Sequence, residues 1–104
     1  MQTYPKKRID IMVEAPLMQR VLNLLDQQGV SGYTVLSALA GRGQDGAWHR
    51  DGVVGRAGAL VTVFCILDEA RVDEVLEPLF KLVSRQIGIV TVSDVQVIRP
   101  THFT

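Results

Sequence analysis

The run ALVTVFCIL, from Ala59 to Leu67, constrains the fold of this chain strongly, because a strand built from it is apolar on both sides. Successive side chains of a strand point to opposite faces. One face would carry Leu60, Phe64 and Ile66, and the other Val61, Val63, Cys65 and Leu67. A layer of helices can cover only one of these faces, and the other is expected to be covered by another subunit. The sequence therefore predicts a homo-oligomer.

The periodicity of apolar residues predicts five further elements around this strand. The expected order is strand 8–14, helix 16–29, strand 33–39, strand 59–67, a helix that Asp68 caps, and strand 89–98. This β-α-β-β-α-β order is typical of an α+β, ferredoxin-like split βαβ domain, with two helices on one face of an antiparallel sheet. A long loop separates its second and third strands.

Two places depart from ideal periodicity. Pro78 interrupts the second helix, and we expect a kink or an early end there, because proline removes a helical hydrogen bond. In the last strand the apolar pairs change phase, from Val90 and Val92 to Val95 and Val97. A bulge near Ser93 or Asp94 would reconcile the two phases.

Length and charge limit the classes of function. Residues 1–104 suffice for one domain with its own core. The 11 basic and 11 acidic side chains balance, which argues against a nucleic-acid or membrane-surface partner. No apolar run is long enough to span a membrane, and the single cysteine, Cys65, lies within an apolar run. We expect a cytoplasmic protein that does not insert into membranes.

The loop at about 41–57 is longer than ordinary connections, which suggests a binding or regulatory role. Its first residues, Gly41-Arg42-Gly43, suit anion binding, because glycines allow close approach, successive N–H groups can form an anion nest, and a guanidinium binds phosphate. Arg50 and Arg56 are further candidates for anion binding. The alternative is an ordinary solvated loop.

Residues 48–51, WHRD, raise the question of a metal or catalytic site. The only other histidine, His102, is expected in the C-terminal tail, so the convergent ligands that a metal needs are missing. The serines lie in no nucleophile motif, and Cys65 should be buried, so we predict a protein that is not an enzyme. Trp48 is interpreted as a partner-docking residue, or alternatively as a side chain folded back on its own subunit.

Three motifs occur together in one order along the chain. GVSGYTV is followed by GRGQDG, and VSDVQVIR comes near the end. In these motifs and in the order of its elements the chain resembles the PII family of trimeric signalling proteins. The resemblance implies a single PII-like domain over residues 1–104, a homotrimer with adenine nucleotides in clefts between subunits, and a mobile loop that reports the ligand to a partner protein.

The resemblance also implies nucleotide-binding positions. Thr34 falls on the threonine of the family's strand motif, Gly41 and Gly43 on the glycines at the base of its loop, and Arg99 on a C-terminal arginine. The full predicted nucleotide-binding set is Thr34, Gly41, Arg42, Gly43, Gln44, Gly88, Ile89 and Arg99. Arg42, Arg50 and Arg56 form the predicted anion-binding set.

Two departures from the family pattern shape the functional hypothesis. The family's phosphate-binding Gly-Asp-Gly-Lys is replaced by RQIGIV, and the loop contains no tyrosine that could be uridylylated. The chain therefore looks more like PII-like proteins associated with carboxysomes or bicarbonate transporters. We expect a sensor of ADP or AMP, with bicarbonate as a second candidate ligand, that signals inorganic-carbon status. The alternatives are a metal-binding trimer of the divalent-cation-tolerance type and a small ferredoxin-like enzyme.

Overall fold

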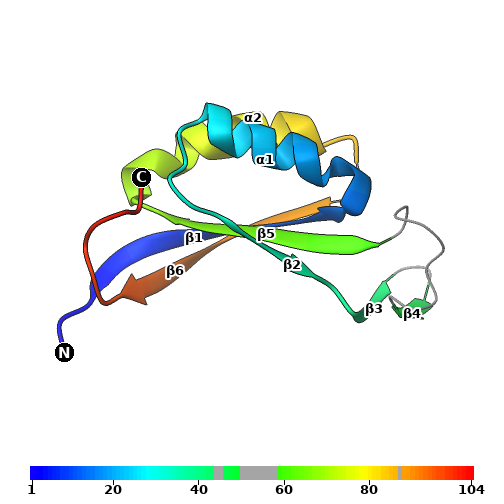
Figure 1. Cartoon of the computed structure of the whole chain (residues 1–104), viewed down its shortest axis with the longest axis horizontal. Helices are drawn as coiled ribbons and strands as arrows, with labels where there is room; N and C mark the ends of the chain where they lie inside the picture. The colour runs from blue at the N-terminus through cyan, green and yellow to red at the C-terminus, as the bar shows by residue number, and fades with distance from the viewer. Residues whose placement is uncertain (44–45, 50–58, 87) are drawn as a thin grey trace.

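The computed structural model describes residues 1–43, 46–49, 59–86 and 88–104. Its main sheet has four antiparallel strands in the order β2-β5-β1-β6. These strands are β1 (Tyr4–Glu14), β2 (Thr34–Ser37), β5 (Leu60–Leu67) and β6 (Gly88–Val97). The helices α1 (Met18–Gln27) and α2 (Val72–Val83) lie side by side on one face of this sheet (Figure 1). The predicted α+β, ferredoxin-like fold is confirmed.

The core lies between the two helices and one face of the sheet. Alternation in β1 buries Ile9, Ile11 and Val13, while β5 buries Val61, Val63, Cys65 and Leu67 toward the helices. The helices contribute Val21 and Leu25 from α1, and Val72, Val75, Leu79 and Val83 from α2. Leu76 of α2 is partly buried and packs at the edge of this core.

The opposite face of the sheet, which we call the open face, carries half-buried apolar residues, including Leu60, Phe64 and Ile66 of β5. It is not purely apolar. Arg8 and Asp10 of β1 also lie on it, joined by two hydrogen bonds of 2.9 Å, and the guanidinium of Arg8 lies 4.0 Å from the centroid of the Phe64 ring.

The segment before α1 and the segment after it explain where this helix begins and ends. A 3-10 turn, η1 (Ala15–Leu17), contains Pro16 and leads directly into α1. At the other end the N–H groups of Gly29 and Val30 donate to the carbonyls of Asp26 and Leu25, and Gly29 adopts a φ of 73°. Such a left-handed residue suits glycine and stops a helix.

Three expectations about the second half of the chain were wrong, one of them only in part. The side chain of Asp68 does not cap a helix; it accepts a hydrogen bond of 2.5 Å from Lys6, and a 3-10 turn, η3 (Glu69–Arg71), precedes α2. Of the two outcomes expected at Pro78, the early end is wrong, because α2 continues to Val83; a kink there stays a prediction. Burial of Val75 and Leu79 on either side of the proline offsets the lost hydrogen bond.

The third error concerns β6, which pairs with β1 in one unbroken register from Tyr4 opposite Val97 to Val13 opposite Gly88. No bulge is needed near Ser93 or Asp94, because the two apolar pairs lie on opposite faces of the same strand. Val90 and Val92 are on the helix side, and Val95 and Val97 are on the open face.

The long loop contains a second, two-stranded sheet, formed by β3 (Ala40–Gly43) and β4 (Gly46–His49). It projects beyond the end of β2, at the opposite end of the molecule from the chain termini (Figure 1). The sequence pattern predicted no strand here. Antiparallel pairing of Gly41 with Trp48 and of Gly43 with Gly46 satisfies backbone groups that side-chain periodicity does not report.

Candidate functional site

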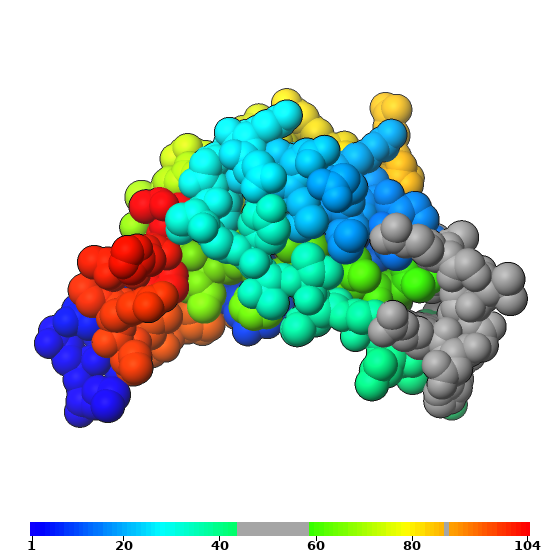
Figure 2. All heavy atoms as spheres, in the orientation of Figure 1, coloured from blue at the N-terminus to red at the C-terminus, as the bar shows by residue number. Residues whose placement is uncertain are grey.

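A cavity of about 380 Å³, which we call the loop-base cavity, lies where the long loop leaves the sheet. The two chain termini, blue and red in Figure 2, lie together at the opposite end of the molecule. The cavity is lined by Met12, Ala38, Ala40, Gly41, Arg42, Gly43, Leu60, Gly88 and Ile89. It therefore brings together five of the eight predicted nucleotide-binding residues, from two segments more than 40 positions apart in the sequence: Gly41, Arg42, Gly43, Gly88 and Ile89.

Strand pairing creates this cavity. Met12 of β1 lies opposite Ile89 at the start of β6, and both side chains face the open face. The N–H of Ala38 donates to the C=O of Leu60 over 3.0 Å, which directs the chain from β2 past the start of β5 into β3. The glycine-rich segment therefore lies beside the start of β6 because both border the same end of the sheet.

The cavity combines an apolar surface with one cation. Met12, Leu60 and Ile89 supply the apolar part, and Ile89 is 61% exposed. Arg42 is exposed and forms no ion pair with another described residue. A lining of this kind suits a ligand with a flat apolar part and an anionic part. Met12 and Leu60 were not predicted as site residues, although their outward phase in two strands was a usable signal.

The structure corrects one expectation about Gly41-Arg42-Gly43. These residues form the strand β3, paired with β4, so their backbone is extended. An anion nest requires successive N–H groups turned toward one point, whereas in an antiparallel strand neighbouring residues direct their N–H groups to opposite sides. The guanidinium of Arg42 is therefore the anion-binding group that this segment offers.

Two predicted nucleotide-binding residues lie outside the cavity. Thr34 is at the start of β2, an edge strand, where it lies opposite Phe64 on the open face. Arg99 follows β6, and its guanidinium lies 5.7 Å from the centroid of the Phe103 ring. The strand β6 separates Gly88 from Arg99 by roughly 30 Å, at about 3.3 Å per residue. One chain therefore cannot present both residues to the same nucleotide.

Three other predicted residues cannot be placed, and a fourth is placed by its backbone alone. Gln44, Arg50 and Arg56 lie outside the described residues. The backbone of Trp48 lies in β4, opposite Gly41, but its side chain is outside what the structure describes. The predictions of anion binding by Arg50 and Arg56, and of partner docking by Trp48, stay predictions.

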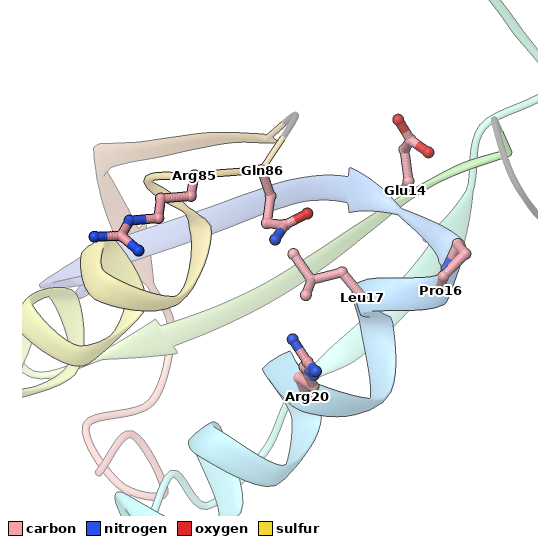
Figure 3. A pocket seen from close by; sticks show the side chains of 6 residues that line it. All are labelled: Glu14, Pro16, Leu17, Arg20, Arg85 and Gln86. Atoms are coloured by element: carbon pink, nitrogen blue, oxygen red, sulfur yellow. The ribbon is translucent and has the colours of Figure 1, made fainter.

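A second cavity, of about 430 Å³, lies between the start of α1 and the segment after α2 (Figure 3). It is lined by Glu14, Pro16, Leu17, Arg20, Arg85 and Gln86. The side chains of Arg20 and Gln86 point toward Leu17, whereas the guanidinium of Arg85 points away along α2 (Figure 3). Gln86 of this cavity and Gly88 of the loop-base cavity are two residues apart in the sequence.

The groups with shifted pKa values lie away from the loop-base cavity. Burial raises the pKa of the Cys65 thiol from 9.0 to about 11, as expected for a cysteine that is 2% exposed. A hydrogen bond to Asp26 raises the pKa of Tyr33, and a hydrogen bond to Asp94 raises that of Lys7. Among the described residues that line the cavity, Arg42 is the one titratable side chain, so they contain no acid–base pair.

The described part of the chain contains no group of three or more His, Cys, Asp or Glu residues that could hold a metal ion. Over the same residues, no helix has both the length and the apolar character needed to cross a membrane.

Comparison with known proteins gives one family. The model of the family described as "Nitrogen regulatory protein P-II" matches residues 6–102, nearly the whole chain. No curated protein sequence is significantly similar to this one.

Solved structures resemble the chain over almost its full length. CPII from Thiomonas intermedia K12, a nitrogen regulatory PII-like protein bound to ADP, AMP and bicarbonate, is 31% identical, with a TM-score of 0.82 and coverage of 95% of this chain and 93% of that one. CPII bound to ADP and bicarbonate is 32% identical, with a TM-score of 0.82 and coverage of 99% and 98%. A PII-like signalling protein of Thermus thermophilus is 25% identical, with a TM-score of 0.78 and 95% coverage of each chain.

Proposed function

We propose that this chain, which belongs to the nitrogen regulatory P-II family, is a non-enzymatic sensor of adenine nucleotide. ADP or AMP is the proposed ligand, and bicarbonate is a second ligand that modifies the response. The similarity to CPII, which binds ADP, AMP and bicarbonate, supports this choice of ligands.

One observation carries the proposal. Residues from the loop, Gly41 to Gly43, share one cavity with Gly88 and Ile89, although the sequence separates the two segments. The guanidinium of Arg42 would bind phosphate or a smaller anion, and the apolar lining would contact the flat part of the ligand. A ligand bound there would touch the base of the loop directly.

The nucleotide site is proposed to lie between subunits of a homotrimer. Gly88 and Arg99 border opposite ends of β6, so the two can contact one nucleotide only if they come from different chains. Thr34 and Arg99 would then complete a site whose other half is the loop-base cavity of a neighbouring subunit. The half-buried apolar residues of the open face support such an assembly, because association would remove them from water.

The proposed signal is inorganic-carbon status. The chain has RQIGIV in place of Gly-Asp-Gly-Lys, and its loop at 41–57 has no tyrosine, so the resemblance to nitrogen regulators is weakest at their phosphate-binding and modification sites. We therefore propose that it is related in function to PII-like proteins associated with carboxysomes or bicarbonate transporters. Such a protein would act in the cytoplasm, and the buried free thiol of Cys65 is compatible with that compartment.

Residues 1–104 would act as one domain, in which the loop at 41–57 reports the ligand to a protein partner. A ligand can change the loop only if it binds one loop conformation more tightly than another. Ligand contact with Arg42 provides such a difference, because β3 is part of both the cavity and the loop. Trp48, in the paired strand β4, is the proposed contact for the partner.

The two alternatives lack a supporting observation. A metal-binding trimer would need convergent ligands, and an enzyme would need a perturbed acid–base pair; neither occurs among the described residues that line the loop-base cavity.

Isothermal titration calorimetry tests the proposal with ADP, AMP and ATP, each with and without bicarbonate. We expect ADP or AMP to bind, without a strong preference for ATP. Arg42→Ala should weaken binding, whereas Arg20→Ala, which removes an arginine from the other cavity, should leave the affinity unchanged. Absence of binding by every adenine nucleotide would rule out the sensor.

A further inference from the structure

The C-terminal segment, residues 98–104, folds back toward the start of α2 (Figure 1). The N–H of Asp68 donates to the C=O of Phe103 over 2.8 Å. Ser31, in the turn before β2, donates twice: its N–H to the C=O of Thr104 and its hydroxyl to the C=O of His102, each over 3.2 Å. Three hydrogen bonds therefore attach this segment to two other parts of the domain.

The backbone of His102 shows that these bonds impose a specific conformation. Its φ is 74°, a value that non-glycine residues adopt uncommonly. Such a conformation persists where the surrounding structure determines it, and here the carbonyls of His102, Phe103 and Thr104 all accept hydrogen bonds. These hydrogen bonds thus fix the backbone on both sides of Phe103, from which its side chain projects.

Phe103 lies near two cations. The guanidinium carbon of Arg99 is 5.7 Å from the centroid of its ring, and the Nζ of Lys6 is 5.8 Å from the same centroid. Lys6 has a second partner, because its Nζ is 2.5 Å from the Oδ1 of Asp68. A cation within about 6 Å of an aromatic ring centroid is attracted to the ring. The ring of Phe103 is therefore a contact that holds the Arg99 guanidinium.

We propose that Phe103 is a positioning residue for nucleotide binding, which restricts the side chain of Arg99 before the ligand arrives. This inference rests on the proposed function, in which Arg99 contacts the phosphate of the nucleotide. A long, free arginine loses conformational entropy when it binds a phosphate. If the ring already limits its conformations, less entropy is lost and the nucleotide binds more tightly.

The first test compares three substitutions at one position by calorimetry with ADP. Phe103→Ala should weaken binding by roughly threefold to tenfold, the range expected for one newly immobilised side chain. Phe103→Tyr keeps the aromatic ring and should restore the affinity. Phe103→Leu keeps apolar bulk without a ring and should bind as weakly as the alanine variant. The matched control is Phe80→Ala, which removes an exposed aromatic residue from α2 and should change nothing.

A double-mutant cycle separates positioning from general stabilisation. In an Arg99→Ala background, Phe103→Ala should have no further effect on the affinity for ADP. Equal weakening in both backgrounds, or an effect of Phe103→Leu no larger than that of Phe103→Tyr, would overturn the inference. If Phe103→Ala does not fold, the comparison of the leucine and tyrosine variants decides.

The outcomes also distinguish this inference from the function on which it rests. If Arg99→Ala weakens binding and Phe103→Ala does not, the sensor stands and the role of Phe103 is wrong. If Arg99→Ala binds ADP like the unmodified protein, the phosphate role of Arg99 is wrong, and the inference about Phe103 fails with it. If the unmodified protein binds no ADP, AMP or ATP, the proposed function itself fails.

Discussion

Gly88 lies directly opposite Val13 where β6 begins, and a Cβ at this position would make tighter than ordinary contacts with its neighbours. A Cβ on Gly88 would come 3.2 Å from the Cγ1 of Val13 and 3.3 Å from the carbonyl oxygen of Met12. Gly88 also lines the loop-base cavity, so a shift of β6 that relieved these contacts would change the proposed site.

Gly88→Ala should therefore destabilise the protein by about 1–3 kcal/mol, as overpacking does, and weaken nucleotide binding. Gly43→Ala is the control within the same cavity, because a Cβ there would meet nothing within 4 Å. Chemical denaturation measures the stability of both variants, and calorimetry measures their affinity for ADP. Equal stability of the two variants would contradict the packing argument.

The open face gives a prediction about assembly. Sedimentation at micromolar concentration should show a trimer. Ile66→Asp places a charge on the open face of β5 and should dissociate it, because an unpaired charge at an interface is costly to bury. Asn23→Asp, at an exposed position of α1, should leave the trimer intact. A stable monomer of the unmodified protein, or a trimer that tolerates Ile66→Asp, would argue against this interface.

Arg99→Ala should weaken ADP binding by about 1.5–3 kcal/mol, the usual contribution of a hydrogen bond to a charged group. The lower end applies if solvent reaches the phosphate. Arg20→Ala removes the same charge from α1 and serves as the control in calorimetry. A loss of affinity that is the same for both variants would indicate a general effect of charge instead of a contact by Arg99.

The β3–β4 hairpin should report ligand binding through hydrogen exchange. A two-stranded sheet is marginally stable alone, so the amides of Gly41 to Gly43 should exchange rapidly without ligand. Nucleotide, bicarbonate or both should slow their exchange, because contact with Arg42 fixes β3. If saturating ligand left the amide exchange rates of Gly41 to Gly43 unchanged, the idea that ligand binding in the cavity affects the loop would be wrong.

We expect the two strands of this hairpin to have different roles: β3 contacts the ligand, and β4 contacts the partner protein. Arg42→Ala is expected to reduce the ligand response directly. Trp48→Ala should leave the affinity for nucleotide within about twofold while weakening capture of the partner. An equal loss of nucleotide affinity in both variants would remove this division.

Cys65 should make stability depend on pH at alkaline values. The pKa of its thiol is about 11 in the folded chain against an ordinary value of 9.0, so between these values the unfolded state binds fewer protons than the folded state. Stability should therefore fall as the pH rises from 9 to 11, by on the order of 2 kcal/mol. Subtracting the stability of Cys65→Ala at each pH isolates this contribution from other titrating groups. A difference that stays constant with pH would contradict the assigned burial.

Most of the fold could be predicted because the buried face of a strand or helix appears in the sequence as a regular spacing of apolar residues. Ile9, Ile11 and Val13 alternate, and Val75 and Leu79 recur at helical spacing, so the faces of β1 and α2 are readable from neighbours in the sequence. The early end expected at Pro78 and the bulge expected in β6 were wrong, because both were inferred from neighbouring residues alone. Packing of α2 outweighs the proline, and pairing with β1 keeps β6 in register whatever its apolar phase.

The sequence by itself determined which segments become strands and helices, which faces they bury, and which residues are chemically suited to bind an anion. Only the tertiary structure decided which of those residues meet. In the folded chain, Arg42 and Gly88 line one cavity, Arg99 lies at the far end of β6, and Gly41 to Gly43 form a paired strand. The reason is physical: a side chain's preference for water or core acts at its own position, whereas distances between remote residues are set by hydrogen-bonded strand pairing, which depends on both partners.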